Sequence, residues 1–348
     1  MTARHSRISG RPVDLRQDDA MSLEVRTGSG TGFELLLAAA AVADSDWRRV
    51  FTYGQAAYAE VRHADPGLVP VVRRFGRFGW INLAGLLAES PAPWTRRRLA
   101  RLVAGTAPDE LLTALVGGRR QQLRARLDDE TIRAAVAGDP AAQRRLRATV
   151  ADTLLQINPW LLRTDPSEVK EICVQLLETM PRLDARAPAT GAIERMLDDL
   201  GGEALLERVA PGIHYAPGYL ERVTLVTSVR AAPILVSVDE VGHTVILHPA
   251  LTDEGTTDAA VQLRELGRAL GDDTRIRILQ ELRAGDRTLA ELCSALRSPR
   301  TTLLHHLALL RSAGLVDLTV MPGAPNVYAL DDRGFEAVAA AAKAFTSR

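Results

Sequence analysis

A polar helix face between residues 298 and 315 carries side chains that could contact nucleic acid. At about 100° per residue, Leu303, Leu307 and Leu310 fall on one side of this segment. The opposite side holds Thr301, His305, Ala308 and Ser312. Hydroxyl and imidazole groups can bond to base edges or phosphates, and Arg300 on the flank could neutralise a phosphate or fork onto guanine. The pattern therefore predicts a helix that reads DNA.

Further candidates for DNA contact surround this face. They are Arg287, Thr288, Thr302, Leu304, His306 and Arg311. Arg287 and Thr288 precede a short predicted helix and could touch the phosphate backbone, whereas Leu304 could touch a thymine methyl. His306 could equally pack against a neighbouring helix, and Arg311 could serve only to favour the carbonyl end of its own helix.

Residues at both ends delimit the reading helix. Ser298 is the expected N-cap, Pro299 suits the first turn, and Gly314 is suited to the left-handed residue that ends a helix. Two short strands are expected next, from Leu315 to Val320 and from Asn326 to Leu330. Together they form a small wing with its tip at residues 321–325.

Further amphipathic helices complete this C-terminal unit. One is expected from Val261 to Leu270, one after a cap at Asp273, and one after a cap at Thr288. A last helix is expected to begin after Asp331 and Asp332. The unit therefore spans residues 261–348.

Four motifs in this order resemble the arsenic-repressor (ArsR/SmtB) type of winged helix-turn-helix regulator. They are LGDDTRIRILQEL, TLAELCSAL, PRTTLLHHLALLRSAGLV and NVYALDDRG, within the last quarter of the chain. The resemblance implies a homodimer whose first and last helices pack across a two-fold axis, so that both reading helices enter successive major grooves of a palindromic operator. The implied dimer interface holds Leu263, Leu266, Leu270, Phe335, Val338, Ala342 and Phe345.

The sequence departs from that family in charge and in metal ligands. The wing tip contains no Arg or Lys, and residues 261–348 carry 12 basic and 10 acidic side chains, a net charge of only +2. We therefore expect modest, salt-sensitive affinity. Cys293 stands where thiol-using members place a first ligand, but Ser294 and Ala295 follow it, and a lone structural cysteine is the preferred interpretation. No metal site and no cofactor are expected.

The region before this unit is expected to be a helical domain over residues 31–250. Helix signals run from Phe33 to about Ala210, and this region is similar to a little-characterised N-terminal domain fused to such units in high-GC Gram-positive bacteria. Its aromatic residues favour a core between crossing helices over a pocket for an apolar ligand. These are Trp47, Trp80, Trp94, Trp160, Phe51, Tyr53, Tyr58, Phe75 and Phe78.

Alternating β-branched residues predict an antiparallel β meander at the end of that domain, over residues 212–250. The expected strands are Arg222–Val229, Ile234–Val238 and Thr244–His248. His214, His243 and His248 could be imagined as metal ligands, but surface or turn positions are the favoured interpretation. The fold class is thus mainly α with small β.

Polar segments flank the helical domain. Residues 1–30 are expected to form a disordered tail, and residues 251–260 a linker. Gly28, Gly30 and Gly32 look like a phosphate-binding loop, but no strand is predicted before them and no Lys-Ser/Thr pair follows.

The composition narrows the class of protein. The 348 residues suit two or three domains, and 43 basic against 43 acidic side chains exclude a general polyanion-coating role. Two distant cysteines, no apolar run of membrane-spanning length and no signal-peptide core predict a cytoplasmic protein without a membrane partner.

These observations favour a dimeric, sequence-specific transcription regulator, which we expect to be a repressor. The N-terminal domain would sense a small organic effector or dock a partner. The alternative is a protein-interaction module with weak DNA binding, which the uncharged wing favours. An enzyme is the least supported hypothesis, because no nucleophile elbow, clustered carboxylate pair or phosphate loop is evident, and no catalytic residue is assigned.

Overall fold

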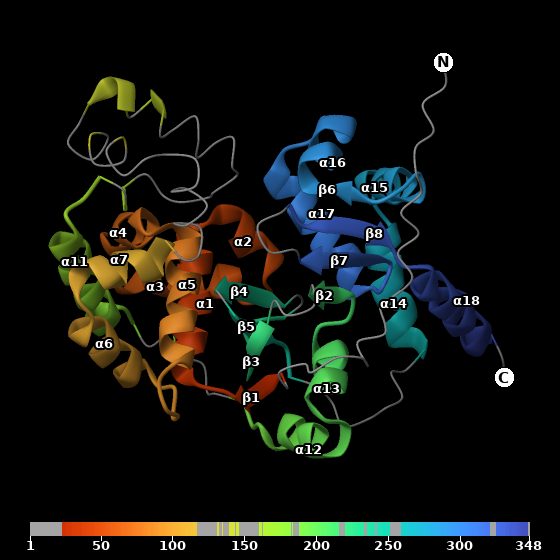
Figure 1. The fold of residues 1–348 in the computed structure, drawn as a ribbon, viewed down its shortest axis with the longest axis horizontal. Coiled ribbons are helices and arrows are strands. Elements are labelled where there is room, and N and C mark those ends of the chain that lie inside the picture. The colour runs from red at the N-terminus through yellow and green to blue at the C-terminus, as the bar shows by residue number, and fades with distance from the viewer. Residues whose placement is uncertain are drawn as a thin grey trace.

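The computed structural model describes residues 23–116, 131, 134, 139–142, 144–145, 160–161, 163–181, 183, 188–215, 220–232, 235–240, 242–250, 259–320 and 325–346. Helices predominate in them, together with two small sheets, which confirms the mainly α fold class with small β (Figure 1). The N-terminal tail up to residue 22, the helix expected near Asp129, most of the one expected over residues 139–157, and linker residues 251–258 lie outside the described residues.

The N-terminal region begins with a short strand and continues as a helical bundle. The strand is β1 (Glu24–Gly28). The helices are α1 (Thr31–Ala43), α2 (Ser45–Val50), α3 (Gly54–Ala64), α4 (Leu68–Arg74), α5 (Gly76–Ala88), α6 (Arg96–Gly105), α7 (Pro108–Val116), α11 (Pro166–Thr179), α12 (Gly191–Leu200) and α13 (Gly202–Val209). Asp165 caps α11 as predicted, but α2 is capped by Asp44 rather than Asp46, because Asp44 Oδ1 accepts from the amides of Asp46 and Trp47.

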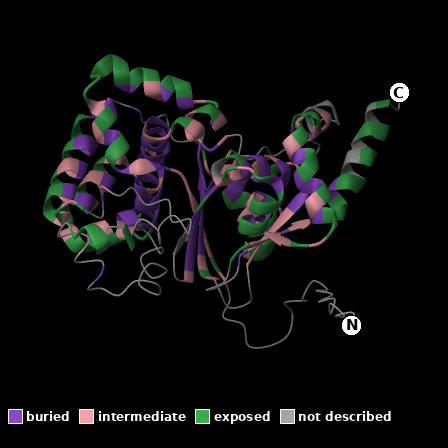
Figure 2. Cartoon of the chain, turned by 90° about the horizontal axis from the view of Figure 1, so that it is seen from above, coloured by how far each residue is buried: buried purple, intermediate pink, exposed green. Residues whose placement is uncertain are grey.

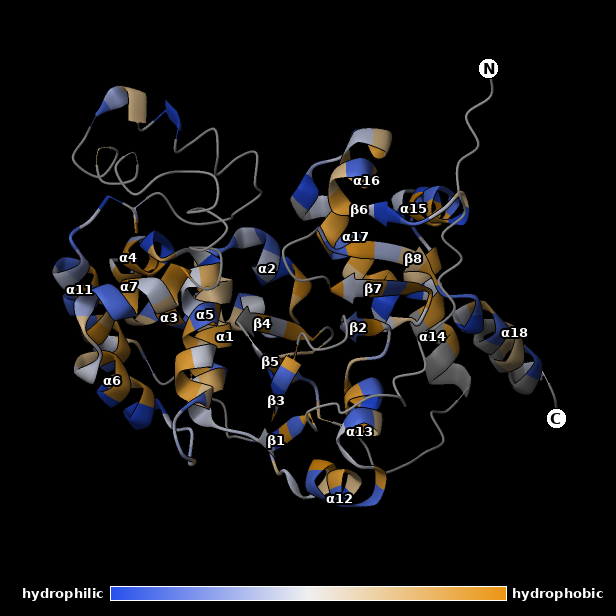
Figure 3. Cartoon of the chain, in the orientation of Figure 1, coloured by the Kyte–Doolittle hydropathy of each residue, from blue (hydrophilic) through white to orange (hydrophobic). Residues whose placement is uncertain are grey.

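The centre of the bundle is α1, which is buried on every side. All its residues from Gly32 to Val42 are buried, and it contacts α3, α4, α5 and α6. Apolar residues accordingly colour most of α1 and α5 in Figure 3. The aromatic residues belong to this core: Trp80 and Phe75 have no exposed surface, and Trp94 is 5% exposed. The predicted core role is therefore confirmed for Phe51, Phe75, Trp80 and Trp94. Trp47, Tyr53, Tyr58 and Trp160 are partly buried against the core, and Phe78 is not among its members.

The first sheet is mixed rather than an antiparallel meander. It contains β3 (Leu220–Thr227), β4 (Val236–Glu240) and β5 (Gly242–His248) in the order β1-β3-β5-β4. β1 and β5 both pair with β3 in parallel, and only β4 pairs antiparallel, with β5. The expected meander is therefore wrong in its pairing. It also missed β1, which shows that residues 24–28 of the expected tail are ordered.

The glycine run does follow a strand, contrary to expectation, but Trp94 closes the loop. The backbone N–H of Gly32 donates to Trp94 O at 3.0 Å. A Cβ on Gly28 or Gly30 would collide with Trp94, and one on Gly32 would lie 2.7 Å from Leu87 Cδ2. These glycines therefore permit close packing of the Trp94 segment on the start of α1.

The C-terminal unit follows the predicted order of elements. It comprises α14 (Ala259–Leu270), α15 (Asp273–Arg283), β6 (Arg287–Thr288), α16 (Leu289–Leu296), α17 (Arg300–Ser312), β7 (Val316–Val320), β8 (Val327–Leu330) and α18 (Asp332–Thr346). Its core contains Ile278, Leu292, Leu303, Leu307 and Leu310. Thus the apolar face predicted for the reading helix does build the core.

The second sheet joins the two regions of the chain. Its order is β2-β7-β8-β6, and β2 (Ile213–Tyr215) comes from the segment expected to belong to the N-terminal meander. β2 pairs in parallel with β7, in the register Ile213 to Leu318 and Tyr215 to Val320. The wing sheet therefore has a fourth strand supplied by the N-terminal region.

Candidate nucleic-acid interface

The helix before the turn, α16, is bounded at both of its ends. Thr288 Oγ1 accepts from the Glu291 amide at 3.3 Å, and Glu291 Oε2 accepts from the Thr288 amide at 2.7 Å. At the other end, Arg297 adopts a left-handed conformation with φ 48°. This capping box and the left-handed residue bound α16 to eight residues and turn the chain into α17.

The reading helix starts one residue later than predicted. Pro299 is its N-cap, because the Leu303 amide donates to Pro299 O at 3.1 Å, and the Ser298 side chain makes no capping bond that defines the start. Its end is as predicted: Gly314 has φ 69°, and its amide donates to Arg311 O at 2.8 Å. The cap of α15 likewise falls on Asp272 instead of Asp273, since Asp272 Oδ1 accepts from the Arg275 amide.

His306 faces the protein core rather than an open surface. It is 8% exposed, and its Nδ1 lies 3.3 Å from Arg275 Nη1 and 3.8 Å from Asp272 Oδ1. Burial lowers the pKa of His306, so the neutral imidazole is favoured. Arg275 itself donates to the carbonyls of Arg268 and Ala269 at the end of α14. His306 thus connects α17 to the α14–α15 junction.

Arg311 is also buried, at 9% exposed. Its charge lies near the hydroxyls of Tyr328 on β8 and Tyr215 on β2, while burial lowers its pKa. A Cβ at Gly212 would be 3.6 Å from Arg311 Cγ. The Arg311 side chain therefore packs between its own helix, α17, and the second sheet, and it is not available to enter a DNA groove.

The remaining candidates on α17 differ in exposure. Thr302 is exposed, Leu304 is half-buried against the C-terminal core, and Arg300 and His305 are half-buried. The Thr301 side chain lies outside the described residues, although its backbone is helical. Burial lowers the pKa of both Arg300 and His305. Arg300, predicted on the flank, and His305, predicted on the outer face, are therefore both partly covered.

The wing presents little positive charge, as the sequence predicted. Arg287 on β6 is half-buried and donates to the carbonyl of Asp286 beside it. Asp317 on β7 lies 3.3 Å from His214 Nε2 and 3.8 Å from Arg333 Nη2. Residues 321–324 at the tip lie outside the described residues.

The expected dimer residues divide between core and surface. Leu266 belongs to the C-terminal core, and Leu263 and Leu270 are half-buried. Phe335 is 38% exposed and Ala342 is exposed on α18, which extends away from the body of the molecule in Figure 2. The side chains of Val338 and Phe345 lie outside the described residues.

Thr288→Ala is expected to lower the free energy of unfolding by about 1 kcal/mol, because the capping box at α16 loses its hydroxyl acceptor. Urea denaturation followed by circular dichroism measures this change. Thr288→Ser, which retains the acceptor, is the matched control and should lie close to wild type. Equal stability of the alanine variant and wild type would show that the cap contributes nothing.

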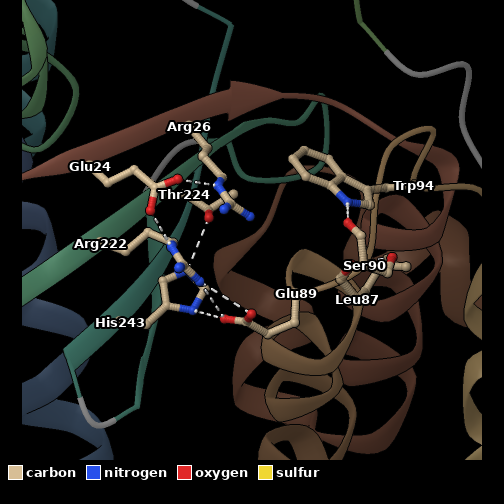
Figure 4. Close-up of polar contacts among 9 residues, drawn as sticks. All are labelled: Glu24, Arg26, Leu87, Glu89, Ser90, Trp94, Arg222, Thr224 and His243. Carbon is tan, nitrogen blue, oxygen red and sulfur yellow. Dashed lines mark hydrogen bonds and ion pairs between the residues drawn. The ribbon is translucent and has the colours of Figure 1, made fainter.

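A second polar cluster joins the first sheet to the end of α5 (Figure 4). His243 Nδ1 is 2.8 Å from Glu89 Oε1, and its Nε2 is 3.0 Å from Thr224 Oγ1. Arg222 bridges Glu24 and Glu89 at 2.8 and 3.2 Å. A carboxylate, an imidazole and a hydroxyl in this order could activate the Thr224 hydroxyl as a nucleophile. Thr224 has no exposed surface, however, and could not meet a substrate. The cluster instead ties α5 to the sheet.

The three histidines considered as metal ligands are separated by the fold. His243 and His248 are buried on β5, and His214 pairs with Asp317 in the other sheet, so the expected surface or turn positions are wrong for the first two. Across the described residues, no group of three His, Cys, Asp or Glu side chains could hold a metal ion. Cys293 is a half-buried free thiol.

Two helices joined by a tight turn, with a flanking two-stranded wing, define a winged helix-turn-helix. Residues 270–319 match a family model described as a helix-turn-helix domain, and this part of the chain is an ArsR-like helix-turn-helix domain. No curated protein and no solved structure matched the chain. A helix-turn-helix domain indicates DNA binding in transcriptional regulation.

Sequence reasoning missed β2 as part of the site. The tripeptide Ile213-His214-Tyr215 is too short to give a periodic signal, and its partner strand is about a hundred residues further along the chain.

Among the described helices, none combines the length and apolarity needed to cross a bilayer.

Proposed function

We propose that this protein is a dimeric, sequence-specific transcription regulator that acts as a repressor. The observation that supports this most directly is α17, whose apolar face builds the core while Arg300, Thr302 and His305 lie on the opposite side or its flanks. Helices of this type place their outer residues against base edges in the major groove. The dimer would form through α14 and α18, so that two copies of α17 read the half-sites of a palindrome.

The N-terminal region would sense a small organic effector or dock a partner, and it would change the disposition of α17. Two features connect the N-terminal region with the wing and support a route from that region to α17. They are the pairing of β2 with β7 and the apolar cluster to which both regions contribute residues. An open groove of about 810 Å³ between α6 and α11, lined by Arg96, Arg97, Leu177 and Met180, offers a candidate effector surface. Neither a cofactor nor a catalytic step is part of this proposal.

A gel-shift experiment with the DNA upstream of the protein's own gene tests DNA binding. The dimer is expected to retard this DNA at low salt, with affinity that falls steeply as salt increases. Failure of an intact dimer to bind even at low salt would exclude the proposed function. It would favour the second candidate, a protein-interaction module, for which the net charge of +2 in residues 261–348 is the supporting observation.

Arg300→Ala is expected to weaken binding to this DNA about tenfold, because it removes the cation closest to the start of the reading helix. Fluorescence anisotropy titrations at several salt concentrations measure the loss and the accompanying decrease in salt dependence. The matched control is Arg283→Ala at the exposed end of α15, which removes the same charge from another helix. If both variants lose the same affinity, Arg300 has no specific role.

A further inference from the structure

The wing sheet is held by the N-terminal region through strand addition. The Leu318 amide donates to Gly212 O at 2.7 Å, and β2 then runs in parallel with β7 to Tyr215. The backbone edge of β7 that would otherwise be free is therefore paired. Because β7 follows α17 after a short turn, β2 is anchored close to the C-terminal end of the reading helix.

An apolar cluster strengthens this attachment. Val320 from β7 packs with buried residues of the N-terminal region, and Leu318 lies against the same cluster. Its N-terminal members include Ile193, Leu205, Ile213, Val223 and Ile246. His214 Nε2 adds a contact of 3.3 Å with Asp317 Oδ2. The wing is thus continuous with the core below the first sheet.

The other end of the reading helix faces the helical bundle. In the view of Figure 1, α2 is drawn between α17 and the rest of the bundle. Burial lowers the pKa of both His305 and Arg300, and charges of the C-terminal unit come next. Smaller effects come from the N-terminal region: the Asp46 carboxylate on α2 raises the pKa of His305, and the Arg77 guanidinium on α5 lowers the pKa of Arg300. The two side chains of α17 best suited to DNA therefore lie within electrostatic reach of the N-terminal region.

These side chains are covered but poorly satisfied. Arg300 Nε and His305 Nδ1 each expose less than 1 Å², and within the described residues neither atom has a hydrogen-bond partner. Leaving a buried polar atom unpaired costs free energy, because the atom has lost its hydrogen bonds to water. A contact that carries this cost is suited to opening, because DNA or water would satisfy both groups.

We propose that the N-terminal region is an autoinhibitory clamp: β2 holds the wing sheet while α2 covers the reading face of α17, and α2 must move away before DNA binds. This inference rests on the proposed function of α17 as the DNA-reading helix. The major groove admits a helix only when its outer side chains are free to meet base edges, so α2 and DNA compete for Arg300 and His305. The affinity measured for the whole chain is then reduced by the fraction of molecules that are open.

The test uses the full chain with Asp46→Arg, which replaces a carboxylate within electrostatic reach of His305 and Arg77 by a cation. Asp46 is 45% exposed and pairs with the exposed Arg49, so the fold should tolerate the change. The matched control is Glu60→Arg, an exposed position on α3, which changes the total charge equally. Figure 1 draws helix α3 farther from α17 than α2 is.

Two measurements are made on each protein: anisotropy titration with a labelled duplex from upstream of the gene, and hydrogen exchange of residues 300–312. Relative to Glu60→Arg, Asp46→Arg should bind the duplex about fivefold more tightly and exchange faster in this segment. Equal affinity and equal exchange in the two variants would overturn the clamp, while measurable binding by both would leave the DNA-reading function intact. Faster exchange without DNA binding by any variant would overturn the proposed function itself, and the inhibition with it.

Discussion

Trp94→Ala is expected to lower the free energy of unfolding of the N-terminal region by about 3–5 kcal/mol. Trp94 is 5% exposed, its ring packs edge-on against Phe33 at 5.3 Å, and its indole N–H donates to Ser90 O at 2.9 Å. Its ring also fills the space above Gly28, at the end of β1. Truncation would leave a cavity where the first strand, α1 and the segment before α6 meet.

Urea denaturation followed by far-ultraviolet circular dichroism measures this loss. Trp94→Phe is the control, because it keeps an aromatic ring against Phe33 but lacks the indole donor, and it should lose only part of the stability. A loss below about 1 kcal/mol for the alanine variant would mean that the loop can collapse into the vacated space. The glycines would then be explained by something other than the packing of Trp94.

The helices were predictable because their signals are local. The Asp165-Pro166 pair gives α11 its first residue, and the Leu303, Leu307 and Leu310 stripe gives α17 its buried face. Errors at helix ends were small and had a common cause. Neighbouring polar residues such as Asp44 and Asp46 can both cap a helix, and only the backbone conformation decides which one accepts the bonds.

Strand pairing was less predictable because partners lie far apart in the chain. β1 precedes its partner β3 by nearly two hundred residues, and its sequence, Glu24 to Gly28, resembles a polar tail. Successive β-branched runs suggested hairpins, but β3 and β5 are parallel, with β4 between them in sequence and at the sheet edge in space. Periodicity identifies a strand, yet register and neighbours depend on tertiary packing.

The candidate site shows the same division between local and long-range information. The sequence predicted His305 on the outer face of α17 and Arg300 on its flank, and both side chains are half-buried in the structure. It could not show that α2 approaches that face or that β2 pairs with β7, because both contacts join segments more than a hundred residues apart.

The protein is expected to lose stability between pH 6.5 and 4, with a large contribution from His248. This residue is 1% exposed on β5, and burial lowers its pKa from 6.5 to about 4. Its Nδ1–H donates to Pro249 O at 2.7 Å, and its Nε2 lies 3.4 Å from Thr227 Oγ1, so the folded state holds the neutral ring. Below pH 6.5 the unfolded chain binds the proton more strongly, and acid therefore favours unfolding.

The size of this effect follows from the two pKa values. At pH 5 the unfolded ring is almost fully protonated and the folded ring is mostly neutral, which lowers the free energy of unfolding by about 2 kcal/mol relative to neutral pH. Burial also lowers the pKa of His243, His305 and His306, which adds in the same direction, whereas the raised pKa of His214 beside Asp317 acts in the opposite one. Urea denaturation of wild type and His248→Asn at pH 7.5 and pH 5 isolates the His248 contribution. Asparagine can still donate to Pro249 O but does not titrate, so the free energy of unfolding of the variant should fall by about 2 kcal/mol less between the two pH values. An identical pH dependence of both proteins would show that the buried His248 ring does not cause the loss of stability in acid.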